Sequence, residues 1–250
     1  MIYYIFSDIH ANYEALTTFL EKTDHIPNSK RLCLGDVVGY GSSPNECIQM
    51  LHQREIPVLM GNHDYALIHP ELRMTFNYMA REAIEYHAKI ITPENREIIK
   101  QYPYTLTFDR FSITHSSFGN PPAFTYILST STAGLAFSAL DKKIGFFGHT
   151  HLPMIYIDKP NASSGDQISE ITIHGSDKVF LLEEENLYLI NPGSIGQPRD
   201  HDFRSSFVIY DEENGSINFQ RLTYNCQKES RRMLKLNLPD FLTTRILTGQ

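Results

Sequence analysis

Five short apolar runs in this 250-residue chain each lead directly into a polar motif, and this repeated pattern limits the folds open to it. Runs of this length that are rich in Ile, Val, Leu and Phe are typical of buried β-strands. The runs are Ile2–Phe6, Leu32–Leu34, Val58–Met60, Phe111–Ile113 and Ile144–Phe147. Polar residues at the carboxyl ends of such strands would meet at one edge of a sheet, where ligands collect in open α/β folds. We therefore expect an α/β fold with a binding site at that edge.

The first 64 residues alternate strand-like and helix-like segments. After the first run, apolar residues recur at helical spacing as Ala15, Leu16, Phe19 and Leu20. Residues 43–46, Ser-Pro-Asn-Glu, predict the start of a second helix, because serine and glutamate three residues apart form a capping box and proline favours the first helical position. We therefore expect a β-α-β-α-β unit with right-handed crossovers and a third strand at Ile56–Met60.

The strand pattern disappears between Asp64 and Tyr102, where apolar residues lie at helical spacing. We expect residues 65–102 to form a helical insert beside the site. This insert could act as a cap that shapes substrate access, or it could simply cover a sheet. Its two histidines, His69 and His87, are expected to be structural.

From Tyr104 onward the sequence predicts mainly strands and hairpins. Further expected strands are Tyr104–Phe108, Met154–Ile157, Ile171–His174, Val179–Leu182, Leu187–Ile190, Phe207–Tyr210 and Ile217–Arg221. Two facing sheets with helices outside would accommodate both halves of the chain. Residues 160–167 are expected to form an exposed loop or hairpin tip, and residues 226–250 a helical tail that covers a sheet or contacts a second copy. We expect one domain over residues 1–250, as is common for α/β chains of this length.

Composition and charge exclude several partners. The formal net charge of −7 argues against a nucleic-acid backbone or an anionic membrane, because both require a basic face. Three cysteines without a C-x-x-C pair argue against a disulfide scaffold and favour a reducing cytoplasm. The apolar run before Asp8 is too short for a signal peptide, and no run approaches the length that spans a bilayer. We expect a cytoplasmic protein.

The polar motifs supply seven candidate metal ligands without a thiolate. They are Asp8, His10, Asp36, Asn62, His115, His149 and His151. Oxygen and imidazole ligands suit first-row divalent ions, and a carboxylate can bridge two of them. A single histidine is more often structural, but five of the eleven histidines follow strand-like runs, which scattered structural residues would not do. We expect two ions, with manganese first and iron, zinc or nickel as alternatives.

The motifs and their order resemble those of the calcineurin-like metallophosphoesterase superfamily. Further matching segments are residues 35–41, Gly-Asp-Val-Val-Gly-Tyr-Gly, followed by Pro-Asn-Glu at 44–46, and residues 191–200. They are similar to a small microbial branch described as phosphodiesterases or diadenosine tetraphosphatase-like proteins. The resemblance implies a four-layer α/β/β/α sandwich of two mixed β-sheets flanked by helices. The same pattern assigns Asp8, His10 and His151 to one ion and Asn62, His115 and His149 to the other, with Asp36 bridging both.

The resemblance also implies a mechanism. A hydroxide that bridges the ions would attack phosphorus in line, because bound ions lower the pKa of water, and no covalent enzyme intermediate would form. His63 would act as the general acid that gives a proton to the leaving oxygen. Asp64 would orient the His63 imidazole through a hydrogen bond, although this carboxylate could instead stabilise a helix N-terminus.

Four further residues are candidates for substrate contact. Arg199 and Arg204 could hold a second phosphate, since a guanidinium can donate two parallel hydrogen bonds to phosphate oxygens, but either could instead form a surface salt bridge. Asn12 could contact substrate or only cap the first helix. Tyr40 could contact substrate or only pack on the glycine-rich loop.

The leading hypothesis is an enzyme that hydrolyses a phosphodiester or a nucleotide polyphosphate such as diadenosine tetraphosphate. Its partner would be a small phosphorylated substrate, with a nucleotide as one candidate, and the chain could form a homo-oligomer. A phosphomonoesterase or protein phosphatase is an alternative, but phosphoprotein phosphatases carry an Asp-Arg pair and a glutamate where this chain has residues 39–41 and Asp64. Ala11 stands where glycine is common. A third alternative is a non-catalytic binding scaffold, although His63 and all seven ligand positions are present.

Overall fold

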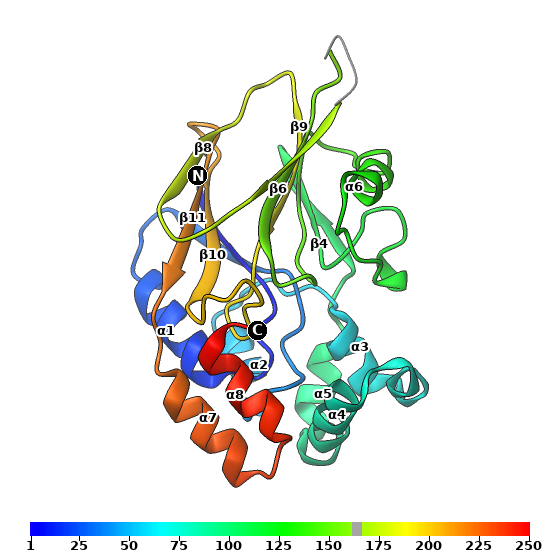
Figure 1. The fold of residues 1–250 in the computed structure, drawn as a ribbon, viewed down its shortest axis with the longest axis vertical. Coiled ribbons are helices and arrows are strands. Elements are labelled where there is room, and N and C mark those ends of the chain that lie inside the picture. The colour runs from blue at the N-terminus through cyan, green and yellow to red at the C-terminus, as the bar shows by residue number, and fades with distance from the viewer. Residues whose placement is uncertain (162–166) are drawn as a thin grey trace.

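The computed structural model describes residues 1–161 and 167–250, and it contains two facing β-sheets (Figure 1). The five-stranded sheet has the order β2-β1-β10-β11-β8, and the six-stranded sheet has the order β3-β4-β5-β9-β6-β7. The first sheet consists of β1 (Ile2–Phe6), β2 (Ser29–Cys33), β8 (Lys178–Leu181), β10 (Ser205–Asp211) and β11 (Ser216–Leu222). The second consists of β3 (Thr105–Thr107), β4 (Phe111–Thr114), β5 (Ile144–Phe146), β6 (Pro153–Asp158), β7 (Ile168–Thr172) and β9 (Leu187–Pro192). Most of the predicted tip at 160–167 lies outside the described residues.

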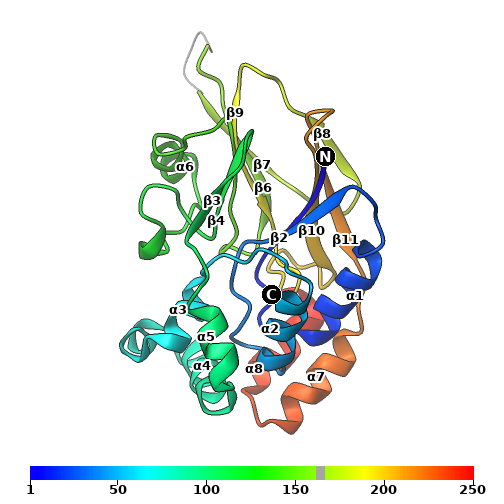
Figure 2. The ribbon, with the colours of Figure 1, turned by 180° about the vertical axis from the view of Figure 1, so that it is seen from behind.

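Both sheets are mixed. In the first, β1 pairs in parallel with β2 and antiparallel with β10. In the second, β5 lies parallel to β4 and β9, while β6 lies antiparallel to β9. Because helices flank the outer faces of these sheets, the predicted four-layer α/β/β/α sandwich is confirmed (Figures 1 and 2).

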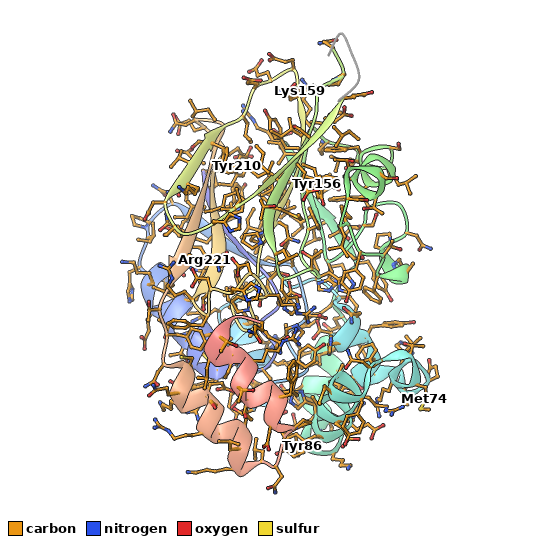
Figure 3. All side chains as sticks on the ribbon, viewed as in Figure 1. Met74, Tyr86, Tyr156, Lys159, Tyr210 and Arg221 are labelled. Atoms are coloured by element: carbon orange, nitrogen blue, oxygen red, sulfur yellow. The ribbon has the colours of Figure 1, made fainter. Side chains whose placement is uncertain are left out.

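The facing surfaces of the two sheets form a shared apolar core. Its buried side chains include Ile5 of β1, Phe111 of β4, Phe146 of β5 and Tyr210 of β10. Phe111 packs edge-on against Tyr210 with ring centroids 5.4 Å apart, and Figure 3 labels Tyr210 within the first sheet. Such aromatic pairs contribute about 0.5–1.5 kcal/mol beyond their buried area. This core therefore joins strands that are more than 200 residues apart in the sequence, and one domain over residues 1–250 stays a prediction.

Helices cover the outer faces of both sheets. On the first sheet lie α1 (Tyr13–Thr23) and α2 (Pro44–Gln53), and the ring of Phe19 in α1 packs 4.4 Å from that of Phe6. The tail is helical as predicted, and α7 (Cys226–Lys235) and α8 (Asp240–Thr248) pack on their own chain beside α1 and the loop after β2. Among the described residues, no helix combines the length and apolar character needed to cross a bilayer.

One helix was not predicted. The outer face of the six-stranded sheet is covered by α6 (Thr130–Phe137), which contributes Ala133, Ala136 and Phe137 to an apolar cluster with Tyr156 of β6 (Figure 3). Two of the three buried residues are alanines, and the rest of the segment is rich in serine and threonine. Such a short sequence carries little apolar periodicity, so the helix is apparent only from its packing.

The insert at 65–102 is helical, as predicted. It contains α3 (Asn62–Ile68), a 3₁₀ helix (Pro70–Thr75), α4 (Tyr78–Ile90) and α5 (Pro93–Ile99), which gather at the same end of the molecule as α2 (Figure 2). Leu67 of α3 and Ile99 of α5 are buried in the apolar cluster beneath the first sheet. This part of the insert therefore packs against α2 and shares its apolar cluster.

The prediction of a regular third strand at Ile56–Met60 is wrong. Val58 forms only an isolated parallel bridge with Cys33 of β2. Hydrogen bonds of 3.0 Å run from the Cys33 N–H to the Pro57 carbonyl and from the Leu59 N–H to the Cys33 carbonyl, but the Met60 N–H donates to Pro103 instead. Pro57 has no N–H with which to extend the ladder. The segment still delivers Asn62 to the same sheet edge.

Candidate metal centre

Loops at one edge of the two sheets bring the predicted metal ligands together. Three buried groups of side chains have ligand atoms within 4.8 Å of one another: Asp8 with His10 and His151, His10 with Asp36 and His63, and Asp36 with His115 and His149. Asn62 joins them, because its Oδ1 lies 3.2 Å from the His115 Nε2. All seven predicted ligands therefore belong to one centre, and Asp36 lies between its two halves.

The backbone of these loops is strained where it turns ligands inward. Five ligand residues have positive φ: Asp8 (56°), His10 (50°), Asp36 (53°), His149 (68°) and His151 (62°). This left-handed region costs a residue other than glycine about 1–2 kcal/mol. Such strain persists where the surroundings fix the conformation, and it is concentrated at functional sites. Here the Asp8 carboxylate accepts the His149 N–H at 3.1 Å, and the Asp36 carboxylate accepts the His63 N–H at 2.8 Å. These two hydrogen bonds join the loops to one another and stabilise their strained backbone.

Backbone carbonyls fix the orientation of three imidazoles. The Nδ1 atoms of His10, His115 and His151 donate to the carbonyls of Val38 (3.0 Å), Leu34 (2.9 Å) and Gln197 (2.6 Å), respectively. A carbonyl can only accept a hydrogen bond, so each Nδ1 must carry the proton. The Nε2 atoms therefore point into the centre, which is the arrangement that metal-binding histidines use.

The donor set fits divalent cations. The Nε2 atoms of His10 and His151 lie only 3.1 Å apart, and neither carries a proton to share with the other in the neutral rings. The Asp8 Oδ1 lies 3.3 Å from the His151 Nε2. Among the described residues, neither this oxygen nor the buried His149 Nε2 has a hydrogen-bond partner. Buried polar atoms rarely lack partners, and cations placed among these lone pairs would satisfy them.

Burial and local charge set the protonation of the centre. Burial lowers the pKa of His149 to about 3 and those of His10 and His151 well below their usual value, so these rings are neutral bases at pH 7. Burial also lowers the pKa of His115, but the Asp36 charge outweighs it and raises this pKa to about 9. The charge of His115 in turn keeps Asp36 ionised, although burial alone would raise the pKa of that carboxyl. Asp36 is therefore a negatively charged carboxylate within the centre.

His63 lies at the start of α3 and is held by packing alone. Its ring centroid is 4.6 Å from that of Tyr40, 4.7 Å from that of Phe76 and 4.9 Å from that of His10. Its Nδ1 is buried and has no hydrogen-bond partner among the described residues. Burial lowers the pKa of His63 to about 4.

The predicted hydrogen bond from Asp64 to His63 is wrong. The Asp64 carboxylate accepts the N–H groups of Val37 at 3.0 Å, Val38 at 3.1 Å and Gly61 at 3.2 Å. Asp64 lies in the first turn of α3, and its bond to the Gly61 N–H is that of a carboxylate at a helix N-terminus. This residue therefore holds the backbone around the centre and leaves the imidazole ring free.

The four substrate candidates lie in different surroundings. Asn12 caps α1 by accepting the Ala15 N–H at 3.1 Å, and it donates to the Gly196 carbonyl at 2.8 Å. Arg204 forms a multiple hydrogen-bonded ion pair with Asp202, so its guanidinium is already occupied. Arg199 donates to the Gln197 side chain at 3.2 Å, and its charge lowers the pKa values of His10 and His63. Tyr40 packs its ring against the rings of both histidines. Arg199 and Tyr40 are thus the two candidates at the centre.

A cleft of about 510 Å³ opens beside the centre. Its inner wall contains Asn62, His63 and His149, and Phe76 and other residues of the insert line one side. The opposite side contains Phe124 and Tyr126, and the Tyr126 ring is stacked on that of His149 at 3.8 Å. Residues of the insert therefore line the cleft beside the centre, and their role as a cap that shapes substrate access stays a prediction.

Phe124 and Tyr126 were not predicted from the sequence. They lie in the loop between β4 and α6, which starts directly after the ligand His115. A loop that leaves the same sheet edge as a ligand is well placed to line the site. Aromatic residues next to Pro121-Pro122 in such a loop were therefore a usable indication.

Comparison with known proteins decides the family. The sequence model of the calcineurin-like phosphoesterase superfamily domain matches residues 1–215 of this chain. The chain belongs to the calcineurin-like phosphoesterase superfamily. This superfamily is metal-dependent, so the predicted class of metal-dependent phosphoric ester hydrolase is confirmed.

Individual relatives are similar over nearly the whole length of the chain. The uncharacterized protein MJ0912 of Methanocaldococcus jannaschii is 32% identical over 250 residues, which cover 98% of this chain and 97% of the relative. The crystal structure of a metallophosphoesterase from Sphaerobacter thermophilus is 30% identical with a TM-score of 0.86, and the match covers 100% of both chains. The hypothetical protein PH1004 of Pyrococcus horikoshii OT3 has the same fold, with 19% identity, a TM-score of 0.77 and coverage of 100% of this chain and 98% of its own.

Proposed function

We propose that this calcineurin-like phosphoesterase hydrolyses a phosphodiester or a nucleotide polyphosphate. Two divalent ions would take part, and manganese is the first candidate for both. Asp8, His10 and His151 would hold one ion, Asn62, His115 and His149 the other, and Asp36 both. The observation that carries this proposal is the convergence of these side chains. Three groups of them have ligand atoms within 4.8 Å of one another, and the unprotonated Nε2 atoms of His10 and His151 face each other. Iron, zinc or nickel would suit the same donors.

The chain's own residues would orient the ester and supply a proton. When bound, divalent ions make hydroxide available near neutral pH and offset charge on the phosphate oxygens. His63 lies on the inner wall of the cleft and would give its proton to the leaving oxygen. The negative charge of the phosphoester favours the protonated imidazole against the effect of burial. Arg199 would donate to a phosphate oxygen.

The aromatic cleft supports an ester that carries a planar organic group. Phe76, Phe124 and Tyr126 offer rings against which a base or aryl group can stack. An ester without a planar group would leave this surface without a partner. This feature favours a substrate that carries a base or an aryl group.

We further propose a cytoplasmic location and a small phosphorylated substrate. Cys33, Cys47 and Cys226 are free thiols, and the first two are buried, which suits a reducing compartment. The net charge of −7 is unsuited to binding a nucleic-acid backbone.

The proposal is tested by hydrolysis with chelator-stripped protein, with and without added Mn²⁺. Bis-p-nitrophenyl phosphate, p-nitrophenyl phosphate and diadenosine tetraphosphate are compared in parallel. We expect manganese to restore turnover, with the diester or the dinucleotide hydrolysed faster than the monoester. A faster monoester would favour the phosphomonoesterase alternative, and bound metal without turnover of any ester would favour the binding scaffold.

A further inference from the structure

His87 of α4 holds the glycine-rich loop that follows Asp36. Its ring is fully buried, its Nδ1 accepts the Gly39 N–H at 3.0 Å, and its Nε2 donates to the Gly41 carbonyl at 2.9 Å. An N–H can only donate and a carbonyl can only accept, so both hydrogen bonds require the neutral ring with its proton on Nε2. Burial also lowers the pKa of this ring to about 4. His87 therefore joins the insert to a loop that precedes it by more than 40 residues.

The loop held by His87 forms one wall of the position occupied by His63. Gly39 has φ of +92°, and a Cβ at this residue would overlap the His63 ring, including a 2.9 Å approach to its Cγ. Only glycine leaves room for the imidazole at this point. The next residue, Tyr40, packs its ring 4.6 Å from that of His63. A shift of residues 39–41 would therefore move the surface on which the imidazole rests.

The insert also contacts His63 directly. Phe76, two residues before α4, packs 4.7 Å from the His63 ring. No hydrogen bond to Nδ1 of His63 is present within residues 1–161 and 167–250 to fix the ring. The position of His63 thus depends on two contacts with the insert, one made directly by Phe76 and one transmitted from His87 through residues 39–41.

We infer that His87 is a positioning residue, which aligns His63 with the leaving oxygen by fixing residues 39–41. This inference rests on the proposed role of His63 as general acid. A general acid matters most when the leaving group is a poor one, because a good leaving group departs without protonation. Loss of the two His87 hydrogen bonds should therefore slow esters with poor leaving groups more than esters with good ones.

The test compares His87→Leu, His87→Gln, His63→Ala and the control His69→Leu in the manganese-loaded, full-length protein. His69 is a half-buried histidine of the same insert, and its ring lies 3.3 Å from Glu71. The substrates are diesters that share one retained group and differ in the leaving group, p-nitrophenoxide against an alkoxide. Metal content is measured in every variant, because the Val38 carbonyl next to this loop accepts a hydrogen bond from His10.

We expect His87→Leu to lower kcat for the alkyl ester by roughly tenfold to a hundredfold, with at most about threefold loss for the p-nitrophenyl ester and full metal content. His87→Gln should restore most of the rate, since its amide can accept from Gly39 and donate to Gly41. The glutamine variant also allows the kinetics to be measured if the leucine variant does not fold. In His63→Ala, adding His87→Leu should cause no further loss, because nothing remains to be positioned.

Equal loss on both esters, loss of metal, or no loss at all in the His87 variants would overturn this inference while leaving the general-acid role of His63 intact. An additive loss in the double variant would do the same. If His63→Ala itself slows both esters equally, the acid role proposed for His63 fails, and the inference fails with it.

Discussion

The metal-ligand loops and the His63 side of the site hold their histidines by different means. His10, His115 and His151 are each oriented by a hydrogen bond from Nδ1 to a backbone carbonyl. His63 has no such bond among the described residues and rests against Tyr40, Phe76 and a glycine. Hydrogen bonds fix a tautomer and a direction, which metal ligands need. Packing fixes only a position and leaves the ring nitrogens free, which suits a group that must give up a proton.

The largest expected effect comes from Asp36→Asn, which breaks the metal side of this comparison. The variant removes the charge that both halves of the centre share, so we expect turnover to fall at least about 10³-fold and metal content to fall with it.

His63→Ala should lower turnover by about 10²–10⁴-fold while the protein keeps its metal. Turnover and metal analysis of purified protein check both. Equal metal loss in the two variants would show that His63 belongs with the ligands.

A smaller effect is expected for Arg199 and Arg204, because the sequence did not show which of them contacts phosphate. Arg199→Ala should lower kcat/KM by about 10- to 100-fold, because a charge-assisted hydrogen bond contributes roughly 1.5–3 kcal/mol. Arg204→Ala is the matched control, since that guanidinium is bound to Asp202. Steady-state kinetics on one diester decide the question. Similar losses in the two variants would contradict the placement of Arg199 alone at the phosphate.

The aromatic cleft offers a test of substrate class. Phe124→Ala should raise KM about 3- to 10-fold for aryl or nucleotide esters, because stacking contributes about 1 kcal/mol, and it should leave kcat nearly unchanged. Leu128→Ala, an exposed residue of the same loop, serves as the control. The same KM increase for a dimethyl phosphate diester would mean that the loop, and not stacking, had been disturbed.

The convergence of the candidate ligands could be predicted because their positions are encoded locally. An apolar run followed at once by Asp8, Asp36 or His115 places the side chain at a strand end, and parallel neighbours then bring these ends together. The contacts of Asp64 with Val37 and Val38 could not be predicted in this way, because they depend on how α3 enters the loop. The same holds for the hydrogen bonds of His87, which accepts the Gly39 N–H and donates to the Gly41 carbonyl. Sequence spacing showed a helical insert and did not show which of its faces meets the site.

The smallest effect is expected at the far end of the same glycine-rich loop, which is held by a buried carboxyl group. Glu229 of α7 accepts the Ser42 N–H at 3.0 Å, and burial raises its pKa to about 7. Because the folded protein binds this proton more tightly than the unfolded chain, stability should fall as pH rises from about 4.5 to 7.

Glu229→Gln removes this pH-dependent contribution and can keep the bond to Ser42 through its amide oxygen. We expect it to raise the free energy of unfolding by about 1–2 kcal/mol at pH 8 and by nothing at pH 4, where both states are protonated. Urea denaturation at the two pH values measures this, with Glu97→Gln as an exposed control on α5. A gain that is the same at both pH values would mean that packing, and not the buried charge, distinguishes the two side chains. Activity should stay within about twofold of the parent, because Glu229, unlike His87, holds a part of the loop that does not touch His63.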